Sequence, residues 1–405
     1  MITHALNECS GGVTAPQGFL AGGLYCGIRK MKKDLMMIYS TTSATAAGVF
    51  TLNKTQAAPV LVDKQQLQHS PLCSVIVANS GNANACTGER GLNDSWRMAE
   101  LAAQMLDVPK EQVLVSSTGV IGQYLPMDKV ESGIRQISQQ LSRSGNKDAA
   151  EAIMTTDTYP KEVAVQFTIA SSVVTIGGAA KGSGMIAPNM ATMLAFITTD
   201  ALIPVSALQT ALKSANARSF NRITVDGDMS TNDMVLILAN GLAANKPIKE
   251  HTEEYQLFTA ALEYVMIKLA KMIARDGEGA TKLVEVLVTG ARSEEEAAQA
   301  ARSVANSNLV KTAVHGADAN WGRILAAVGY SGVDFNPDLV EISFGDLPVL
   351  KKNYEIVLDE EKAKHVLTQE NIVIKVDLNQ GSQSARFWTC DLTKEYVHIN
   401  ASYRS

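Results

Sequence analysis

The segment KGSGMIAPNMATMLAFITTDA, residues 181–201, joins a glycine-rich turn to an apolar run, and a single threonine stands between them. Gly182, Gly184 and Pro188 precede this residue, Thr192, and the apolar letters MLAFI follow it. Glycine and proline mark turns, and a short apolar run bounded by turn signals is typical of a buried strand. We therefore predict a turn that ends near Thr192 and a buried strand that begins with it.

Strands and helices alternate along the rest of the chain. Apolar runs predict buried strands, and apolar residues at helical spacing predict helices. Strands are predicted over 73–80, 113–117 and 281–291, a hairpin over 164–178, helices over 95–106 (capped by Asp94 or Ser95) and 253–274, and a helix after the capping box Ser293–Glu296. The alternation predicts an α/β protein whose helices cover the faces of its sheets. A chain of 405 residues exceeds one ordinary core, so we expect two domains or two interleaved halves.

The composition is that of an ordinary globular protein. Hydrophobic residues make up 46% of the chain and charged residues 19%. With a net charge of −5 and no stripe of Lys and Arg, we expect no nucleic-acid partner. No apolar run reaches the length of about 18 residues that spans a membrane. The start, MITHALNECSGGV, lacks the features of a signal peptide, and the five scattered cysteines fit a reducing compartment, so we expect a cytoplasmic protein.

Common catalytic motifs are missing from the sequence. It contains no G-x-S-x-G, H-E-x-x-H or C-x-x-C. In GGAAKGSG (177–184) the order is Lys-Gly, whereas a phosphate-binding loop needs Gly-Lys-Ser/Thr, so this segment is not interpreted as one. Cys86 in NSGNANACTG is expected to shape a pocket rather than to act as the nucleophile.

The segment FNRITVDGDMSTNDM (220–234) is rich in Asp, Asn and Thr. Its carboxylates, Asp226, Asp228 and Asp233, are of the type that binds hard cations. The favoured interpretation is a structural loop that borders the active site. We therefore expect no metal ion.

Two interpretations of Thr192 are open on the residues alone. Thr192 is either a structural threonine after a turn or the nucleophile of an enzyme. A threonine hydroxyl is a poor nucleophile unless a base takes its proton. If the peptide bond before Thr192 is cut, the freed α-amine, with an ordinary pKa of about 7.7–8, supplies that base. One residue then carries both nucleophile and base, so that no histidine is needed.

The same hydroxyl is able to cut the chain. Thr192 Oγ attacks the carbonyl carbon of Ala191, an ester forms, and water then releases the new amino terminus. Small Ala191 and the nearby Gly182 and Gly184 allow the tight backbone geometry that such an attack needs. The predicted cleavage site is therefore the Ala191–Thr192 bond.

Acyl transfer also needs donors that stabilise an oxyanion, and the segment SSTGVIG (116–122) offers them. The candidates are the Thr118 side chain and the backbone N–H of Gly119. Glycine lets the backbone approach a substrate closely, and fixed donors stabilise the developing negative charge. The alternative is a simple turn at the end of a strand.

These segments resemble the ornithine acetyltransferases, also called glutamate N-acetyltransferases, of arginine biosynthesis. The resemblance extends along the whole chain and keeps the order of the family. It rests on GGVTAPQGFLAGG (11–23), VANSGNANACTG (77–88), SSTGVIG (116–122), MTTDTYPK (154–161), AKGSGMIAPNMATMLAFITTDA (180–201), FNRITVDGDMSTNDMVLILANG (220–241), ARDGEGATK (274–282), GADANWGRI (316–324) and YVHINASYRS (396–405).

The resemblance implies a precursor cut into an α chain, 1–191, and a β chain, 192–405, that stay together, usually as an α2β2 heterotetramer. It implies an α/β sandwich of central β-sheets between helices, a fold shared with a class of N-terminal-nucleophile aminopeptidases. The implied reaction moves an acetyl group from N2-acetyl-L-ornithine to L-glutamate. Some members also use acetyl-CoA as donor, and no metal or redox cofactor is required.

Roles in the family carry over to matching positions of this sequence. Thr192 is implied as the nucleophile that carries the acetyl group, with an oxyanion hole formed by Thr118 and Gly119. The implied substrate-binding residues are Thr155 (or the adjacent Thr156), Lys181, Thr192, Glu278, Asn400 and Ser405. Many family members end in threonine where this chain has Ser405, and the hydroxyl is kept.

Charge supports two of these roles. Lys181 presents a compact positive charge that suits the α-carboxylate of an amino acid, and Glu278 lies between two glycines, where it is able to approach an ammonium group. Taken alone, the first would pass as a surface lysine and the second as a solvated loop acid. The stretch EYVHIN (395–400) alternates like a strand, and we expect it to hold Asn400 and the C-terminal residues in the site.

Two rival functions are compatible with the residues. An aminopeptidase or amidase would use the same fold and nucleophile with water as the acceptor. A non-catalytic protein that binds a small molecule would not cut itself. The acceptor requirement and the mass of the purified chain separate these alternatives.

Overall fold

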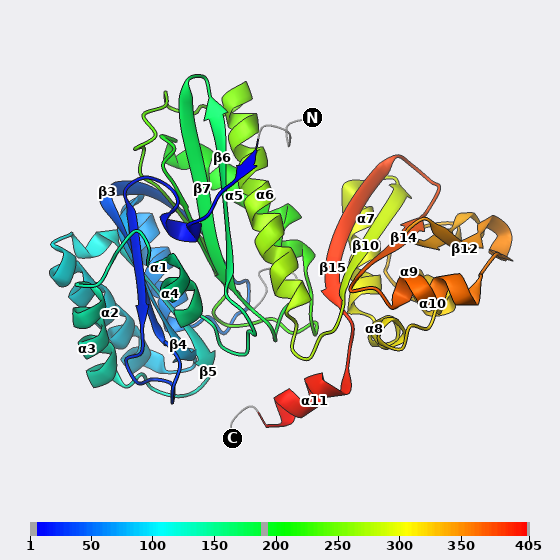
Figure 1. Cartoon of the computed structure of the whole chain (residues 1–405), viewed down its shortest axis with the longest axis horizontal. Helices are drawn as coiled ribbons and strands as arrows, with labels where there is room; N and C mark the ends of the chain where they lie inside the picture. Colours follow the sequence, from blue (N-terminus) through cyan, green and yellow to red (C-terminus); the bar gives the residue numbers. More distant parts are fainter. Residues whose placement is uncertain (1–5, 188–192, 403–405) are drawn as a thin grey trace. The chain divides into compact units, whose positions relative to one another are not determined.

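The computed structural model describes residues 6–187 and 193–402, and Figure 1 shows their helices and strands. The chain divides into two compact units, each assembled from separate stretches of sequence. Unit 1 comprises Met1–Gly182, Asn189–Asn221 and Asp228–Ile273, and unit 2 comprises Ser183–Pro188, Arg222–Gly227 and Ala274–Ser405. The units are interleaved in sequence, so the predicted cleavage site does not separate one from the other.

The sheet of unit 1 carries its strands in the order β1-β6-β7-β8-β9-β3-β4-β5, with β2 paired to β3. Pairs β8–β9 and β4–β5 are parallel, and the remaining pairs are antiparallel. The strands are β1 Asn7–Glu8, β2 Phe19–Leu24, β3 Leu35–Phe50, β4 Leu72–Asn82, β5 Val113–Val120, β6 Lys161–Ile169, β7 Ser172–Lys181, β8 Leu194–Thr199 and β9 Met234–Ala239. The hairpin predicted over 164–178 is confirmed as β6 and β7.

Both faces of this sheet are buried. Successive side chains of a strand point to opposite faces, and in β3 Met36 and Ile38 belong to one apolar cluster while Leu35 and Met37 belong to another. The first cluster includes residues of α4, and the second includes residues of α2 and α3. The helices of unit 1 are α1 Ala58–His69, α2 Gly88–Leu106, α3 Met127–Ile137, α4 Asn146–Ala152, α5 Val205–Arg218 and α6 Glu253–Arg275, whose last two residues belong to unit 2.

Unit 2 contains a second sheet, in the order β13-β12-β11-β14-β10-β15. Its strands are β10 Leu283–Ala291, β11 Glu341–Phe344, β12 Leu347–Lys351, β13 Glu355–Ile356, β14 Asn371–Asp377 and β15 Gln383–Cys390, and its helices are α7 Glu294–Asn306, α8 Asn308–His315, α9 Trp321–Gly329, α10 Glu360–Leu367 and α11 Lys394–Ala401. In β10, Val284, Val286 and Val288 are buried in the same cluster as residues of α7 and α9. Together the two sheets and their helices confirm the predicted α/β class.

Helix boundaries agree with the sequence where a cap or a long apolar period marks them. Helix α6 spans Glu253–Arg275, against a prediction of 253–274. Helix α7 begins after Ser293, whose hydroxyl accepts a hydrogen bond from the N–H of Glu296 at 3.1 Å, as in the predicted capping box. Both predictions are confirmed.

The predicted start of α2 at Asp94 or Ser95 is wrong. The helix begins at Gly88. Its first turns were missed because they carry exposed polar residues such as Glu89 and Arg90 and show no apolar period. Ser95 lies inside the helix, where its hydroxyl accepts a hydrogen bond from the Asn84 side chain at 2.9 Å. Strand β4 likewise runs on to Asn82, two residues beyond the predicted end.

The strand predicted over 395–400 is also wrong, because this stretch forms helix α11 (red in Figure 1). Thr393 caps the helix and accepts a hydrogen bond from the N–H of Glu395 at 3.2 Å. Tyr396 and Asn400 are four residues apart and so share one face of the helix. Both make hydrogen bonds within unit 2, so this face holds the C-terminal region through a helix and not through a strand.

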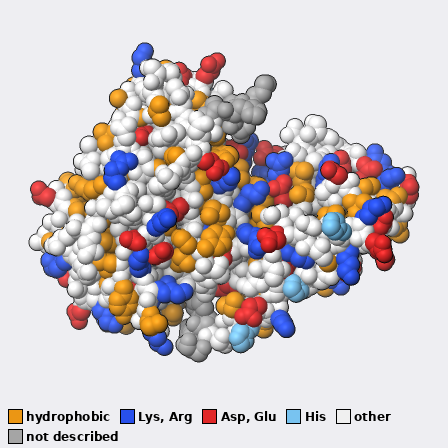
Figure 2. Space-filling view, in the orientation of Figure 1, with side chains coloured by type: hydrophobic (Ala, Val, Ile, Leu, Met, Phe, Trp, Pro, Cys, Tyr) orange, Lys and Arg blue, Asp and Glu red, His pale blue; other side chains and the backbone are white. Residues whose placement is uncertain are grey.

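Acidic and basic side chains are interspersed on the surface shown in Figure 2, and they do not gather into a patch of one sign. A basic stripe of the kind that follows a nucleic-acid backbone is therefore missing from this face. Among the helices of the described residues, none is both long enough and apolar enough to cross a membrane.

Candidate functional site

The predicted oxyanion-hole residues lie on β5, where it runs parallel to β4. Gly119 pairs with Gly81 and has a φ of 136°, a conformation that other residues rarely adopt. A Cβ atom built on Gly119 would lie 2.3 Å from the carbonyl carbon of Gly81. The close approach of the two strands therefore requires glycine at position 119.

Buried amide side chains hold the end of β5 in place. Asn232 donates hydrogen bonds from Nδ2 to the carbonyl oxygens of Ala83 at 2.6 Å and Ser117 at 2.8 Å. The Ser117 hydroxyl donates to Asn79 Oδ1 at 2.6 Å. Because Ser117 immediately precedes Thr118, these contacts fix the direction in which the predicted oxyanion donors leave the strand.

Lys181 ends β7 and pairs with Leu194, the first residue of β8. Its side chain is buried, although lysine is almost never buried without a partner. Its positive charge acts on two buried carboxylates of unit 1, those of Asp157 and Asp233. Lys181 is thus a buried, charge-compensated cation at the end of a strand, and not a surface residue.

Asp157 is the centre of a hydrogen-bond network that joins Thr155, Lys161 and Gly182. Its Oδ1 accepts hydrogen bonds from Lys161 Nζ and from the N–H of Gly182, both at 2.7 Å. Its Oδ2 accepts from the N–H of Thr155 at 2.9 Å. Burial by itself raises the pKa of Asp157, but the charges of Lys181 and Lys161 together with these hydrogen bonds hold it well below its usual range.

We expect Asp157→Asn to lower the free energy of unfolding of the protein by about 3–5 kcal/mol at pH 7, because the buried Lys161 would lose the carboxylate that compensates its charge. The folded pKa of Asp157 lies below the unfolded value of about 3.9. Its stabilising contribution is therefore present above pH ~3.9 and is lost as the pH falls through the folded pKa. Urea unfolding at pH 7 and at about pH 3 should show a difference between variant and wild type that shrinks in acid.

The matched control for this prediction is Asp359→Asn. Asp359 forms an exposed ion pair with Lys362 at 2.8 Å and caps α10, and asparagine is an equally good cap. This variant should unfold like the wild type. Equal unfolding curves for Asp157→Asn and the wild type at pH 7 would contradict the structural role of the buried pair.

Asp233 is fully buried immediately before β9. Its Oδ1 accepts a hydrogen bond from the N–H of Met193 at 3.0 Å, and Oδ2 is buried with no hydrogen-bond partner in the described part of the chain. Burial raises the pKa of Asp233 well above its usual range, against smaller lowering effects of the Met193 N–H and the Lys181 charge. The first described residue after the predicted nucleophile is thus held by a buried carboxyl group.

The backbone of Thr155 is held from two sides. Its N–H donates to Asp157, as described above, and its carbonyl oxygen accepts from Arg29 Nη2 at 3.1 Å. Thr155 and Thr156 are both half-buried. The choice of Thr155 over Thr156 as the substrate contact stays a prediction.

Unit 2 brings Glu278 and Asn400 together. Asn400 Nδ2 donates a hydrogen bond to Glu278 Oε2 at 2.7 Å. Glu278 is buried, and a Cβ atom on Gly184 would lie 2.5 Å from its carboxyl carbon. The glycine at 184 therefore makes room for this carboxylate, and Glu278 is not a solvated loop acid.

The predicted residues fall into two groups, one in each unit. Thr118, Gly119, Thr155 and Lys181 lie in unit 1, and Glu278 and Asn400 lie in unit 2. Ala191, Thr192 and Ser405 lie outside the described residues. Asp157 and Asn232 were not among the predicted residues, although the segments MTTDTYPK and STNDM contain them. The four-residue spacing of Asp157 and Lys161 indicates an ion pair only within a helix, and this stretch is not helical.

The carboxylates of the acidic segment 220–234 make hydrogen bonds to the backbone. Asp226 and Asp233 accept backbone N–H groups, which agrees with the favoured interpretation of a structural loop. Among residues 6–187 and 193–402, no three His, Cys, Asp or Glu side chains gather closely enough to hold a metal ion. Cys86 is exposed in a left-handed backbone conformation after β4.

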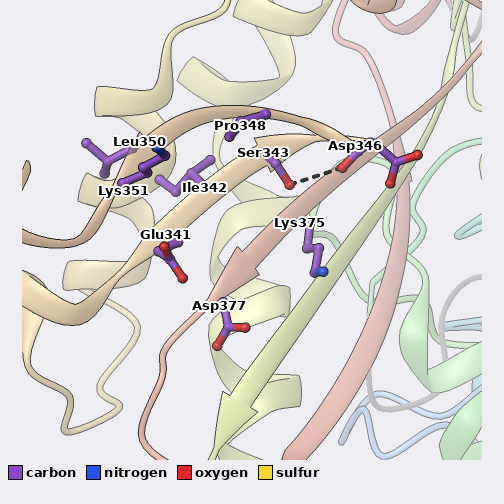
Figure 3. Close-up of a pocket in the computed structure, with 10 residues that line it drawn as sticks. Glu341, Ile342, Ser343, Asp346, Pro348, Leu350, Lys351, Lys375 and Asp377 are labelled. Atoms are coloured by element: carbon purple, nitrogen blue, oxygen red, sulfur yellow. Dashed lines mark hydrogen bonds between the residues drawn. The ribbon is translucent and has the colours of Figure 1, made fainter. Parts of the chain in front are cut away.

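Figure 3 shows a hollow of about 310 Å³ on the sheet of unit 2. Its walls come from β11, β12 and β14 and carry charges of both signs, including Asp346, Lys375 and Asp377. The Ser343 hydroxyl in this hollow donates to the carbonyl oxygen of Gly345 at 3.0 Å. None of the predicted site residues lines this hollow.

Comparisons with known proteins match nearly the whole chain to one family. Residues 20–405 match the ArgJ family. A protein of Oceanobacillus iheyensis named arginine biosynthesis bifunctional protein ArgJ is 52% identical over 409 residues, covering 100% of both chains. A protein of the same name from Symbiobacterium thermophilum is 53% identical over 399 residues, which cover 98% of this chain and 99% of the relative. A crystal structure of ArgJ from Bacillus halodurans is similar with a TM-score of 0.50 and 48% identity, covering 51% of this chain and 98% of that one.

Proposed function

Because the chain belongs to the ArgJ family, we propose that it moves an acetyl group from N2-acetyl-L-ornithine to L-glutamate and so regenerates N-acetylglutamate for arginine biosynthesis. The observation that carries this function is the family match over residues 20–405, together with full-length relatives at about 50% identity. The described site residues provide the charges that amino-acid substrates need. We also propose a role in this reaction for each of the predicted site residues.

In the first half of the reaction, Thr192 Oγ attacks the acetyl carbonyl carbon of acetylornithine. The α-amine of Thr192 takes the hydroxyl proton, and Thr118 with the Gly119 N–H stabilises the oxyanion. The bond between the acetyl carbon and the ornithine nitrogen then breaks, and the proton passes to that nitrogen. Ornithine leaves, and the acetyl group remains on Thr192 as an ester.

In the second half, the amine of glutamate attacks the carbonyl carbon of this ester. The bond to Thr192 Oγ breaks, Oγ regains a proton, and N-acetylglutamate leaves. The chemistry requires no metal or redox cofactor. Because the nucleophile and the base belong to one residue, the absence of a catalytic histidine motif in the sequence is consistent with this mechanism.

The α chain, 1–191, and the β chain, 192–405, are proposed to stay together after self-cleavage. Strand β8, which would belong to the β chain, lies between β7 and β9 in the sheet of unit 1. It pairs with Ile176–Lys181 of β7, which would belong to the α chain, over its whole length. This pairing in a buried sheet supports the proposal that the two chains stay together after the bond is cut.

We propose that two charged side chains, those of Lys181 and Glu278, bind the charged groups of the substrates. Lys181, buried and compensated by acidic neighbours, binds the α-carboxylate. Glu278, oriented by its hydrogen bond to Asn400 Nδ2, binds the ammonium group of ornithine. Thr155 and the C-terminal Ser405 contribute further polar contacts.

We expect Glu278→Gln to raise the KM for acetylornithine by about 10–100-fold, which corresponds to the loss of one hydrogen bond between charged groups. Glutamine keeps the size of the side chain and an oxygen that accepts from Asn400, so the fold should be unchanged. Steady-state kinetics with varied acetylornithine measures the effect. Asp346→Asn, which removes a carboxylate of unit 2 from the hollow in Figure 3, should keep the wild-type KM.

The relatives named bifunctional suggest a second donor. We propose acetyl-CoA as a co-substrate that supplies new acetyl groups to glutamate through the same Thr192 ester. The site of action proposed for the protein is the cytoplasm, and the proposed assembly is a heterotetramer of two α and two β chains. No nucleic-acid or membrane partner is proposed.

An assay of the purified protein with acetylornithine or acetyl-CoA as donor and glutamate as acceptor tests this function. Ornithine should form from acetylornithine only when glutamate is present. Equal rates of ornithine release with and without glutamate would instead favour the aminopeptidase or amidase alternative. An intact mass that shows no cut before Thr192 would favour the non-catalytic binding protein.

A further inference from the structure

The loop that joins β2 to β3, residues 25–34, carries an arginine to which the proposed acetyl transfer assigns no role. Arg29 is half-buried, and its guanidinium reaches the loop after α4, which contains the predicted substrate contact Thr155. The aliphatic stem of Arg29 lies beside Gly81, the strand partner of Gly119. These residues all belong to unit 1. One side chain therefore contacts the surroundings of two predicted parts of the site.

The guanidinium of Arg29 donates to two consecutive backbone carbonyls. Nη1 donates to the carbonyl oxygen of Met154 at 2.7 Å, and Nη2 donates to that of Thr155 at 3.1 Å. A guanidinium is planar and its donors are fixed in direction, so it is able to hold two acceptors at once, whereas an ammonium group acts as a single point charge. Hydrogen bonds from a charged donor are also stronger than those between neutral groups. The two carbonyl groups are therefore held in one orientation.

A buried carboxylate holds the same loop through its N–H groups. The N–H of Thr155 donates to Asp157 Oδ2 at 2.9 Å, and Oδ1 of the same carboxylate accepts from the N–H of Gly182 at 2.7 Å. Thr155 is thus fixed at its N–H by an anion and at its carbonyl oxygen by a cation. Loss of the Arg29 guanidinium would release the carbonyl side, and the loop would sample more conformations.

The stem of Arg29 packs against Gly81. A Cβ atom built on Gly81 would lie 2.6 Å from Arg29 Cγ, so the stem has room only because position 81 is a glycine. Gly81 pairs with Gly119, and a Cβ atom built on Gly119 would lie 2.7 Å from the Cα atom of Gly81. The stem therefore lies against the residue that supports Gly119, one of the two proposed oxyanion donors.

A second buried carboxylate fixes the loop that carries Arg29. Asp34 is fully buried, and its Oδ1 accepts from the N–H of Cys26 at 2.7 Å. Its Oδ2 accepts from the N–H groups of Gly27 at 3.1 Å and Arg29 at 2.8 Å. The carbonyl oxygen of Asp34 accepts from the N–H of Ser80 in β4 at 2.9 Å. Arg29 therefore extends from an ordered backbone, which lowers the entropy cost of holding its partners.

We propose that Arg29 is a positioning residue for acetyl transfer. This inference rests on the proposed function and deepens it, because the guanidinium orients the loop at Thr155 and the stem supports Gly119 through Gly81. A displacement of about 1 Å costs a reaction of this kind on the order of 100-fold in rate, even when its cause lies away from the reacting atoms. Since the two parts of the side chain support different parts of the site, removal of one part and removal of both should have different kinetic effects.

The test is steady-state kinetics of the full chain with varied acetylornithine and saturating glutamate. Arg29→Met keeps most of the stem and removes the guanidinium, so it should raise the KM for acetylornithine about 10-fold and keep kcat within about twofold of the wild type. Arg29→Ala also removes the stem, so it should raise KM similarly and lower kcat at least ~10-fold. Arg29→Lys keeps a charged donor for one carbonyl, and its KM should lie between those of the wild type and Arg29→Met.

Lys33→Met is the matched control, because Lys33 belongs to the same loop and its charged group also reaches α4. Lys33 Nζ forms ion pairs with Asp148 and, at 2.7 Å, with Glu151, and all three side chains are partly exposed. Exposed pairs of this kind contribute little, so this variant should keep the wild-type KM and kcat. Hydrogen exchange at the amides of residues 154–157 should be faster in Arg29→Met than in Lys33→Met.

Three results would contradict these proposals in different ways. A KM for Arg29→Met equal to that of Lys33→Met would overturn the role of the guanidinium, and equal kcat values for Arg29→Met and Arg29→Ala would overturn that of the stem. If Arg29→Ala fails to fold, Arg29→Met and Arg29→Lys still test the guanidinium through their KM values. A wild type that transfers no acetyl group would overturn the proposed function itself, whereas the difference in hydrogen exchange would still report whether Arg29 orders the loop.

Discussion

Thr192→Ala is expected to leave one uncut chain of 43.3 kDa without acetyl transfer. The variant lacks the oxygen that attacks the Ala191 carbonyl, so the peptide bond stays intact and no α-amine is released to act as base. Loss of a hydroxyl nucleophile lowers kcat on the order of 10⁶-fold in a serine protease, and a comparable loss is expected here. Intact mass and the assay with acetylornithine and glutamate measure the two effects.

Thr192→Ser provides the control, because it keeps the hydroxyl and removes one methyl group. It should still be cut before residue 192 and should retain part of the transfer activity. A Thr192→Ala chain that is processed normally would show that another group performs the cleavage. Cleavage of the wild type at a different bond would exclude Thr192 as the N-terminal nucleophile.

Gly119→Ala is expected to abolish most of the acetyl transfer and to destabilise unit 1. The new methyl group would meet the Gly81 carbonyl carbon at 2.3 Å and the Asn82 nitrogen at 2.5 Å, and neither is a flexible side chain that is able to move away. The strands β4 and β5 must therefore separate, which displaces the proposed oxyanion donors. Removal of one such donor costs about 10²–10³-fold in kcat, and thermal unfolding should occur at a lower temperature.

Gly122→Ala separates this clash from simple backbone strain. Gly122 has a φ of 79°, but nothing lies within 4 Å of a Cβ atom placed on it. The alanine variant at 122 should cost about 1–2 kcal/mol in stability, the cost of a left-handed backbone for a residue with a side chain, and keep wild-type transfer activity. If Gly119→Ala behaved like Gly122→Ala in both measurements, the close pairing of residues 81 and 119 would have no catalytic importance.

Secondary structure was predictable where a periodic apolar pattern extends over the whole element. The hairpin over 164–178 and the helix over 253–274 were confirmed because their apolar residues report which side is buried. The first turns of α2 were missed because their residues face solvent, and exposed positions carry no period. The stretch 395–400 was misassigned because alternate apolar letters outweighed the cap at Thr393 and the spacing of Tyr396 and Asn400.

The candidate site was predictable only in part. The sequence predicts Thr192 as the nucleophile from its chemistry, and it predicts Thr118 and Gly119 as oxyanion donors from a glycine turn. It did not indicate that Lys181 is buried among carboxylates or that Asp157 and Lys161 form a buried pair. Whether these charged side chains are buried depends on the residues that folding packs around them, which the local sequence does not show.

The sequence by itself determined the α/β class and the family, because apolar periods and motifs are local properties of the chain, and for the same reason it predicts Thr192 as the nucleophile. Only the tertiary structure decided that Gly119 must be glycine, that Glu278 accepts a hydrogen bond from Asn400, and that Asp233 accepts one from the N–H of Met193. The reason is physical. Burial and hydrogen-bond partners are set by the neighbours that folding brings together, and in this chain those neighbours lie from about 40 to more than 100 residues apart.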